Sequence, residues 1–462
     1  MRITNSMMSN QMLLNINRNA TSVNTLYNRW ASTKQYQFPS ENPIVASRIL
    51  KFRTTLAENQ QYQKNAAQGL SWMEVTEDGY TECISILKKI RELVSQGDGA
   101  ETAEDKQKLA TQIESLTEQL GIAMNKSYAG RYLFSGYRTD EPGTLLKDDP
   151  TLTYTNIKQS FTGSDIENTR ALEKDSVNNT FSAKDVSIIK LPYKNVTFDS
   201  VTIDGVPLNL PGDIEIKSST DDSAYSPGPD DIYYIQDTGE LVLGTNVAKL
   251  KNLDVSYSKT GFEKGELNPK VYFECTDKDG KTYTMDSQNI EYEFGVGTRF
   301  PINSLAKDAF TSKMYSDLIN FCDTVSKVKI SEISDVIADL KAKDPDLSDE
   351  DARLKALDFI DNEKKEAQAM LGSRFSNMLT IVDNHASALS KSHTDLGTRM
   401  DRLEMIQTRL EQDEESFKKL LSENEDADLI ETAMLLSNAE AAYQAAMQIG
   451  MNIMQVSLVN FL

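Results

Sequence analysis

The chain of 462 residues is long enough for two or three domains with a substantial core. Its 70 acidic and 49 basic residues give a formal net charge of −21, which repels phosphate and argues against nucleic acid and anionic membrane surfaces as partners. The three cysteines, Cys83, Cys275 and Cys322, are odd in number and far apart, which favours buried thiols over a disulfide framework.

The first 40 residues predict a helix that needs a partner. Its apolar positions step by four, three, four and three, the spacing that keeps one seam of a helix apolar; they are Ile16, Ala20, Val23, Tyr27 and Trp30. All charges in this stretch are positive. Asn and Gln interrupt the apolar residues at its start, so we expect no cleavable signal peptide. Because Asn is a weak helix former, the isolated helix should be only marginally stable.

Residues 41–140 predict long helices. No proline occurs between Pro43 and Pro142, and apolar residues recur there at helical spacing. Ser40 or Asn42 can cap the first of these helices, with Pro43 in its first turn. A second helix is expected after a glycine-rich turn.

The middle of the chain changes character, since nine of its 12 prolines lie from Pro142 to Pro301. Short β-branched or aromatic segments, separated by Asp-Gly, Pro-Gly and Thr-Gly turns, predict a β-rich insertion. The expected strands are 186–191, 196–203, 232–236, 241–243, 271–275 and 290–294. Asp277-Lys278-Asp279-Gly280 is similar to part of a calcium loop, but Cys275 would fill the first ligand position, so a hairpin is favoured there.

Helical periodicity returns near Phe310 and continues, with a break around Pro345, to the C-terminus. Residues 420–462 carry only negative charges and a second apolar seam with the same spacing, formed by Met447, Met451, Met454, Leu458 and Phe461. The end of this segment is uncharged, but a lipid-exposed helix would tolerate badly the amides of Gln444, Gln448, Asn452 and Gln455. We therefore expect an amphipathic packing helix and not a membrane anchor.

The opposite net charges of the two ends predict that they pair with each other, antiparallel. The predicted fold is α+β: a long helical coiled-coil rod formed by the N- and C-terminal segments, with an inserted β-rich middle domain. Its parts are an N-terminal assembly helix (1–40), the two parts of the rod (41–140 and 310–424), the inserted head (141–309) and a C-terminal assembly helix (425–462). An ordinary intramolecular helix bundle is the alternative explanation of the same apolar pattern.

Charged residues near the inner ends of the two assembly helices predict how they align. If Ile3 lies opposite Asn460, Lys34 falls near Leu429, and both Arg29 and Lys34 face the neighbourhood of Asp428 and Glu431. Exposed ion pairs contribute less than about 1 kcal/mol each, so these charges would set the register more than the affinity.

No pattern of catalytic or ligand-binding residues stands out, so we predict neither an enzyme nor a cofactor or metal site. The two histidines, His385 and His393, have no neighbouring cysteine or metalloprotease glutamate and are expected to be solvated helix residues. The sequence contains no Gly-x-Ser-x-Gly elbow and no phosphate-binding glycine loop. An enzyme hosted in the middle domain is therefore the least supported alternative.

Short motifs near both ends carry a family resemblance. They are Met1-Arg2-Ile3-Thr4-Asn5-Ser6-Met7-Met8, Pro39-Ser40-Glu41-Asn42-Pro43, Gly130-Arg131-Tyr132-Leu133-Phe134-Ser135-Gly136-Tyr137, Gly397-Thr398-Arg399-Met400-Asp401-Arg402-Leu403-Glu404 and Glu425-Asp426-Ala427-Asp428. These segments resemble the flagellin superfamily and, more narrowly, its hook-associated protein 3 family. The segment that begins at Gly130 is the most discriminating, because filament flagellins lack it.

The resemblance implies a structural role. Such proteins leave the cell by the flagellar type III route with the aid of an export chaperone. They then assemble as a tubular homo-oligomer, a short layer between hook-associated protein 1 and the flagellin filament. The implied location is extracellular, at the hook–filament junction of the bacterial flagellum. Filament flagellin itself, and a type III secreted translocator or needle-tip protein, are the alternatives.

The uncharged amides of Gln444, Gln448, Asn452 and Gln455 suggest one further role within such a tube. Unfolded chains of either charge must pass through the export channel without sticking to its wall. We therefore expect this face to line the channel.

Overall fold

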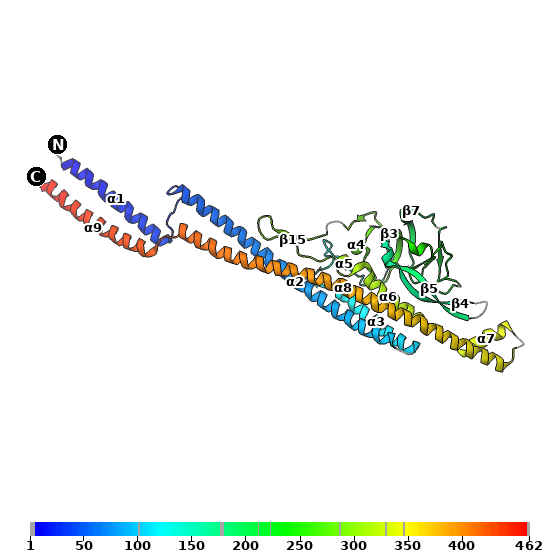
Figure 1. Ribbon diagram of the computed structural model, residues 1–462. Coiled ribbons are helices and arrows are strands. Elements are labelled where there is room, and N and C mark those ends of the chain that lie inside the picture. The colour runs from blue at the N-terminus through cyan, green and yellow to red at the C-terminus, as the bar shows by residue number, and fades with distance from the viewer. Residues whose placement is uncertain are drawn as a thin grey trace. The chain divides into compact units, whose positions relative to one another are not determined.

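The computed structural model describes residues 5–99, 102–175, 180–210, 212–221, 223–285, 288–328, 330–344 and 347–459. Long helices come from both ends of the sequence and strands from its middle, which confirms the α+β fold class (Figure 1). The helices are α1 (Asn5–Ser32), α2 (Pro43–Asp98), α3 (Ala103–Met124), α4 (Pro269–Tyr272), α5 (Ala306–Ala309), α6 (Thr311–Lys327), α7 (Ile333–Lys343), α8 (Asp349–Glu425) and α9 (Leu429–Val459). The predicted break around Pro345 falls between α7 and α8, and Pro345 itself lies outside the described residues.

Capping side chains set where the two longest helices begin. The Asn42 Oδ1 atom accepts a hydrogen bond from the Val45 N–H at 3.2 Å, and α2 begins at Pro43 as predicted. The Ser348 hydroxyl accepts a hydrogen bond from the Asp351 N–H at 3.1 Å at the start of α8. Acidic residues follow in the first turn of α8, where the helix dipole favours negative charge.

Residue contacts divide the chain into two compact units. The first, called the terminal unit, contains Met1–Ala67, Glu293–Thr298 and Glu404–Leu462. The second, called the central unit, contains Gln68–Tyr292 and Arg299–Leu403. Helices α2 and α8 supply residues to both units, so each unit combines segments from the two halves of the sequence.

Two larger sheets form the β-rich part of the central unit. Among the described residues, one sheet has the strand order β13-β12-β3-β11-β6-β7, with antiparallel neighbours throughout. Its strands are β3 (Asp149–Thr162), β6 (Thr197–Ile203), β7 (Val206–Pro207), β11 (Asn252–Phe262), β12 (Glu274–Asp277) and β13 (Thr282–Tyr283).

The other sheet has the order β4-β5-β10-β9-β8, and its β8–β9 pair is parallel. Its strands are β4 (Glu167–Asp175), β5 (Thr180–Lys190), β8 (Ile214–Lys217), β9 (Ile232–Ile235) and β10 (Glu240–Leu243). Two small hairpins are formed by β1 (Ser127–Tyr128) with β2 (Arg131–Tyr132), and by β14 (Glu291–Glu293) with β15 (Arg299–Pro301).

Aromatic side chains fill the space between the two larger sheets. Phe198 from β6 meets Tyr234 from β9 edge to face, with ring centroids 5.0 Å apart. Tyr193, between β5 and β6, meets Phe262 at the end of β11 in the same way at 5.5 Å, and its hydroxyl donates to the Leu267 carbonyl at 2.9 Å. A buried tyrosine with a satisfied hydroxyl adds apolar contact area without an unpaired polar atom.

Five of the six predicted strands coincide with observed ones, namely β5, β6, β9, β10 and β14. The predicted strand at 271–275 is wrong in its first half. Asn268 accepts a hydrogen bond from the Lys270 N–H and caps a helical turn there, so Val271 lies in α4 and the strand β12 begins only at Glu274. The strands β3, β4, β8 and β11 have no counterpart among the predictions.

The predicted hairpin at Asp277 is confirmed. The Asp277 carboxylate accepts hydrogen bonds from the Asp279 N–H at 3.0 Å, the Lys281 N–H at 2.9 Å and the Tyr283 hydroxyl at 2.9 Å. These bonds close an Asx turn between β12 and β13 and occupy the side chain that a calcium loop would need. Within the described ranges, no group of three or more His, Cys, Asp or Glu residues is placed to hold a metal ion.

Two arginines on α8 attach the inserted region to this helix. Arg374 Nη1 lies 3.2 Å from Glu240 Oε1 of β10, and the two side chains are 6% and 1% exposed. Arg374 Nε also donates to the Arg170 carbonyl of β4 at 3.2 Å. Twenty-five positions later, Arg399 Nη1 donates to the Asn303 carbonyl at 2.8 Å. Each arginine is the last residue of a Leu-Gly-x-Arg sequence, and each binds backbone of the inserted region.

The histidines and cysteines are placed within the central unit. His385 is buried, with Nε2 2.9 Å from Asp317 Oδ2 of α6, so its prediction as a solvated residue is wrong. His393 is half-buried, and its ring centroid is 5.9 Å from that of Tyr80. All three cysteines are free and buried, as predicted.

Replacing Arg374 by methionine should destabilise the central unit by about 3–5 kcal/mol, because Glu240 would stay buried without its cation. The exposed ion pair between Arg91 and Asp383, 2.5 Å apart, offers a matched control. Arg91→Met should cost less than about 1 kcal/mol. Chemical denaturation followed by circular dichroism measures the free energy of unfolding of both variants. Equal losses of stability would contradict the stabilising role of the Arg374–Glu240 ion pair.

Candidate assembly surfaces

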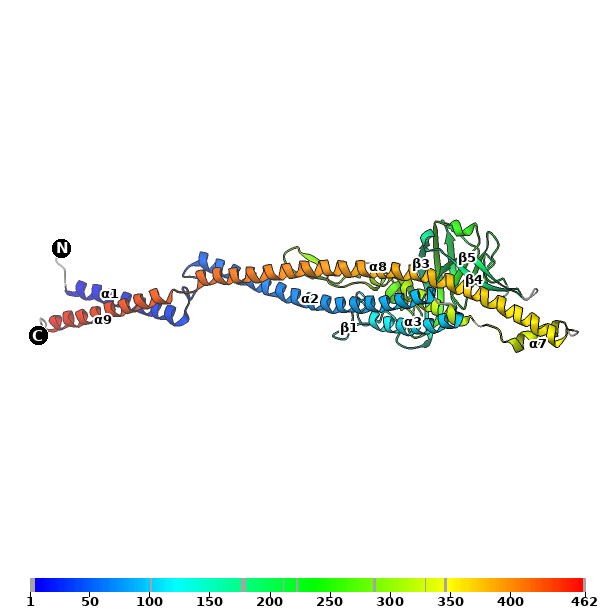
Figure 2. The ribbon, with the colours of Figure 1, turned by 60° about the horizontal axis from the view of Figure 1, so that its bottom comes forward.

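Helices α1 and α9 run side by side as an antiparallel pair within the terminal unit. The views in Figures 1 and 2 agree on this arrangement, and the start of α1 lies at the same end of the pair as the end of α9. The predicted antiparallel pairing of the two ends is therefore present in a single chain. Ile3 and Asn460, which were used to predict the register, lie outside the described residues.

The more buried positions of both helices follow a regular three-and-four spacing, which we call the packing seam. It consists of Ser9, Met12, Ile16, Asn19, Val23 and Leu26 on α1, and Thr432, Leu436, Ala439, Tyr443, Ala446 and Gly450 on α9. Gly450 allows close approach, because a Cβ atom there would lie 3.2 Å from Ile16 Cδ1 and 3.5 Å from Met12 Cε. Small residues on α9 thus receive larger ones from α1.

The predicted apolar stripes only partly coincide with the packing seam. Ile16, Ala20 and Val23 are half-buried, whereas Tyr27 is 54% and Trp30 48% exposed. On α9, Met447 and Met451 are exposed, so the seam lies one residue away from the predicted stripe. The side chains of Met454, Leu458 and Phe461 lie outside the described ones. The prediction that these stripes are buried against the opposite terminus is therefore wrong for the four exposed residues. That the same residues make contacts between copies of the chain stays a prediction.

Many further apolar side chains of the pair are exposed. They are Met7, Met8, Leu13 and Leu14 on α1, and Leu429, Ile430, Met434, Leu435 and Ile449 on α9. A cavity of about 220 Å³ lies between the two helices, lined by Leu13, Met447 and Met451 among others. Exposed apolar side chains in such number are typical of an interaction site. In the described part of the chain, no helix has the length and apolar character needed to cross a bilayer.

The predicted amide face of α9 is exposed as far as it is described. Gln444, Gln448 and Asn452 all face solvent in the isolated chain, and the side chain of Gln455 lies outside the described ones. This face does not overlap the packing seam. Its role as a channel lining stays a prediction.

Residues 33–35 and 425–427 form a junction where α1 ends and α9 is about to begin. The Ala427 N–H donates to the Thr33 carbonyl at 2.9 Å, and the Gln35 N–H donates to the Glu425 carbonyl at 2.8 Å. Lys34 Nζ lies 2.7 Å from Asp426 Oδ1 and 2.8 Å from Glu425 Oε1. The junction therefore combines an antiparallel bridge of the backbone with a shared cation.

The predicted partners of the register charges need correction. Lys34 pairs with Asp426, three positions before its expected neighbour Leu429. Asp428 is occupied otherwise, since its Oδ1 atom accepts hydrogen bonds from the Ile430 N–H at 2.9 Å and the Glu431 N–H at 3.0 Å and caps α9. Among the described residues, no ion pair joins Arg29 to Asp428 or Glu431. In the same part of the chain, Arg29 Nε is buried without a hydrogen-bond partner.

Arg53 of α2, which sequence reasoning missed, completes the junction. Its guanidinium meets the Glu425 carboxylate with two hydrogen bonds, Nη2 to Oε1 at 2.5 Å and Nε to Oε2 at 3.2 Å. Glu425 is 8% exposed in its side chain and therefore holds two cations at a nearly buried position. A Glu-Asp pair before a helix start was the only sequence signal for this role, and it did not identify the partner on α2.

The charges of the junction shift its pKa values. Burial opposes ionisation of Glu425, but hydrogen bonds from Arg53 and Lys34 outweigh it and lower the pKa of this carboxyl. Hydrogen bonds from Lys34 and Ser422 lower the pKa of Asp426. A carboxyl whose pKa is lowered in the folded state stabilises the fold at any pH above its ordinary pKa, which is near 4.5 for Glu. This contribution is lost as the pH falls through the folded-state pKa.

The segment that begins at Gly130 forms a tight hairpin in the central unit. Strands β1 and β2 pair around Ala129 and Gly130, which have φ values of +50° and +76°. Phe134 then packs edge to face on Phe310, with ring centroids 4.7 Å apart, and on Tyr80 at 5.3 Å. The chain reverses direction after α3, and Phe134 of this motif anchors the reversal to α2 and to the start of α6.

Known proteins match part of the chain. Residues 3–139 fit the family model of the bacterial flagellin N-terminal helical region. Flagellar hook-associated protein 3 of Salmonella typhimurium is 27% identical over 142 residues, which cover 30% of this chain and 45% of that protein. The protein of the same name from Escherichia coli is 26% identical with the same coverage. The chain thus spans less than half the length of the curated relatives it matches.

A solved structure of flagellar hook-associated protein-3 from Legionella pneumophila aligns with 12% identity and a TM-score of 0.31, covering 81% of this chain and 98% of that one. Residues 3–139 therefore resemble the N-terminal helical region of bacterial flagellins. The chain is also similar in sequence to flagellar hook-associated protein 3, which confirms the resemblance carried by the motifs. These relatives are structural proteins of the flagellum and not an enzyme family.

Replacing Glu425 by glutamine should loosen the junction at neutral pH, because the amide cannot carry the charge that holds the two cations. Hydrogen–deuterium exchange in peptides covering 33–37 and 425–428 should accelerate about tenfold at pH 7. Glu423→Gln makes the same change at an exposed position nearby and should leave the rates unchanged.

The pH dependence supplies an independent check of the same carboxylate. Lowering the pH from about 7 to about 4 should accelerate exchange in the wild-type junction, after correction for the intrinsic rate, and should add little in Glu425→Gln. Equal exchange in wild type and Glu425→Gln at pH 7 would contradict the role of this residue.

Proposed function

We propose that the chain is a hook–filament junction protein of the bacterial flagellum. Copies of it polymerise into a short tubular layer that connects hook-associated protein 1 to the flagellin filament. It reaches this extracellular position through the flagellar type III route with the aid of an export chaperone. The relationship to flagellar hook-associated protein 3 supports this proposal.

The exposed apolar surface of the α1–α9 pair is the observation that carries the proposal. A single chain pairs its two ends through small residues at the packing seam and leaves Trp30, Met447 and Met451 uncovered. Burial of apolar area stabilises association by about 25 cal/mol per Å², so a lone subunit gains by meeting further copies. In this scheme 1–40 and 425–462 are the assembly helices.

The other parts of the chain have proposed places in the same scheme. Residues 41–140 and 310–424 form the rod, and 141–309 form the head. The amides of Gln444, Gln448, Asn452 and Gln455 line the export channel. Their exposure in the isolated chain, where described, supports this placement, because an uncharged polar wall holds passing chains of either charge weakly.

Replacing Leu13 and Met447 together by glutamine should raise the critical concentration for assembly about tenfold, because both side chains lose apolar contact with a neighbouring copy. Leu354→Gln with Leu357→Gln, a matched change at exposed positions of α8, should leave it unchanged. Sedimentation against protein concentration measures both values. Circular dichroism of the unassembled proteins confirms that all variants keep their helices.

Mixing experiments separate the candidate functions. Purified chain should bind preformed tubes of hook-associated protein 1 and then seed flagellin growth at their ends. Filaments of unlimited length from the chain alone would instead indicate a filament flagellin. No binding to the tubes and no seeding would exclude the junction role.

A further inference from the structure

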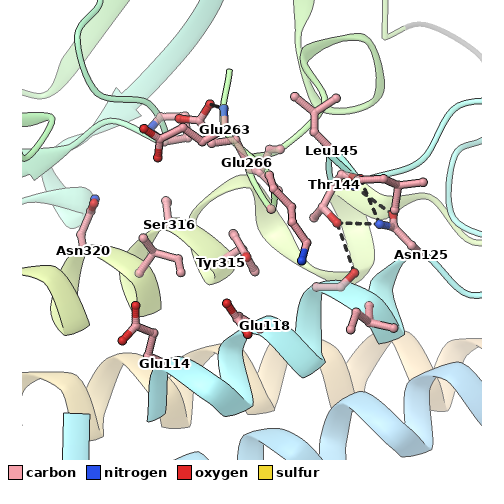
Figure 3. Close-up of a pocket in the computed structure, with 18 of the residues that line it drawn as sticks. Glu114, Glu118, Asn125, Thr144, Leu145, Glu263, Glu266, Tyr315, Ser316 and Asn320 are labelled. Carbon is pink, nitrogen blue, oxygen red and sulfur yellow. Dashed lines mark hydrogen bonds between the residues drawn. The ribbon is translucent and has the colours of Figure 1, made fainter. Parts of the chain in front are cut away.

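A pocket of about 310 Å³ in the central unit is separate from the α1–α9 pair. It lies between α3, α6, the segment around Thr144 and the turn at 263–267 (Figure 3). Five carboxylates and two lysines line it, so negative charge predominates. The apolar side chains of Ile122 and Leu146 stand beside it, 72% and 56% exposed. A cavity of this size, with apolar walls and a few polar groups, fits a small ligand or a single side chain.

Part of this charge is already neutralised within the chain. Lys259 Nζ lies 3.1 Å from Glu266 Oε1, and Lys194 pairs with Asp323 of α6. The turn itself is held by the Glu263 N–H, which donates to Glu266 Oε2 at 2.9 Å. These contacts account for two of the five carboxylates and for one of the two lysines that line the pocket.

Of the charged side chains that line the pocket, three carboxylates and one lysine, Lys264, remain. In the part of the chain that the structure describes, the side chains of Glu114, Glu118 and Glu263 have no hydrogen-bond or ion-pair partner. Figure 3 shows Glu114 and Glu118 on α3 and Glu263 on the opposite side of the pocket. Negative charge therefore faces the cavity from two sides.

Tyr315 supplies a buried polar group from α6. Its side chain is only 6% exposed, it lines the pocket, and its hydroxyl lacks a hydrogen-bond partner among the described residues. A Cβ atom on Gly121 would lie 3.1 Å from the ring, and one on Gly265 would collide with the hydroxyl, so two glycines make room for it. Burial, followed by the charges of Glu118 and Glu266, raises the pKa of Tyr315 to about 12.

We propose that this pocket binds an alkyl guanidinium or ammonium group, the chemistry of an arginine or lysine side chain or of a free polyamine. The N–H groups of the cation donate to the three available carboxylates and to the Tyr315 hydroxyl oxygen. The alkyl stem lies against Ile122 and Leu146. An anion would be repelled, and among the described residues no cluster is arranged to chelate a metal ion.

A pair of probes that differ in charge alone tests the proposal on the full-length, unassembled chain. Acetyl-arginine amide should shift the NMR signals of residues around the pocket with a Kd on the order of 1 mM. Acetyl-citrulline amide has the same length but no charge and should bind at least about tenfold more weakly. The affinity for the arginine probe should fall as the salt concentration rises. Equal binding of the two probes, or none at about 50 mM, would overturn the proposal.

Two substitutions locate the site. Glu118→Gln should weaken binding of acetyl-arginine amide about fivefold, and Tyr315→Phe about threefold. Glu92→Gln is the matched control, because Glu92 is an exposed residue of α2 that does not line the pocket. An equal loss of affinity in Glu92→Gln and Glu118→Gln would overturn the assignment. These readouts use the unassembled chain, so they are independent of the junction role.

A second comparison distinguishes the two sources of such a cation. Tighter binding of acetyl-leucyl-arginine amide than of cadaverine would indicate a side chain on a protein segment, since the leucine adds contact with the apolar rim. Tighter binding of cadaverine would indicate a free polyamine. Both results support a cation site, whereas failure of both probes to bind would refute it.

Discussion

The antiparallel pairing of α1 with α9 is the constraint on which the terminal unit depends. Small residues on α9, above all Gly450 against Met12 and Ile16, let the two helices approach closely on one face. At the inner end, Glu425 holds Lys34 from the start of the chain and Arg53 from α2. The close face and the charged junction together fix which surface of each terminal helix remains uncovered.

Each terminal helix thus has one packed face and one uncovered face. The uncovered faces carry methionine and other apolar residues that a single copy does not bury. A single chain leaves Trp30, Met447 and Met451 exposed. This uncovered face is available for the assembly of copies proposed above. The inserted sheets have a separate attachment, since Arg374 and Arg399 on α8 bind strands and backbone of the central unit.

Sequence patterns predicted the long helices well because their signals are local. Pro43 after Asn42 marks the start of α2, and apolar spacing marks its course. The strand β3 escaped prediction for a physical reason. Asn156 has a φ of +52° and lies where the register of β3 with β11 shifts, so the alternation of apolar residues along β3 is interrupted. In β11, by contrast, Leu253, Val255 and Tyr257 alternate with polar residues, and this signal was overlooked.

The pairing of the two terminal helices was predicted correctly, but the residues that form their contacts were not. The seam of α9 falls on Ala446 and Gly450 and not on Met447 and Met451, because close approach of two helices favours small residues over strongly apolar ones. Lys34 was expected to face the neighbourhood of Asp428, but a carboxylate just before a helix is used more readily as its cap. The acidic pocket could not be predicted, since only folding brings residues 114–118 and 263–266 together.

Cross-linking between isotopically distinct copies tests most directly whether the pairing of α1 with α9 lies within one chain. Ile16→Cys and Gly450→Cys place two thiols on the packing seam, and the native cysteines are buried. Copies labelled with ¹⁴N and ¹⁵N are mixed, assembled and treated with dibromobimane, a short thiol cross-linker. Pairing within one chain predicts linked peptides that carry the same label. Linked peptides with mixed labels in the statistical proportion would show that each α1 pairs with the α9 of another copy, which would contradict this structure.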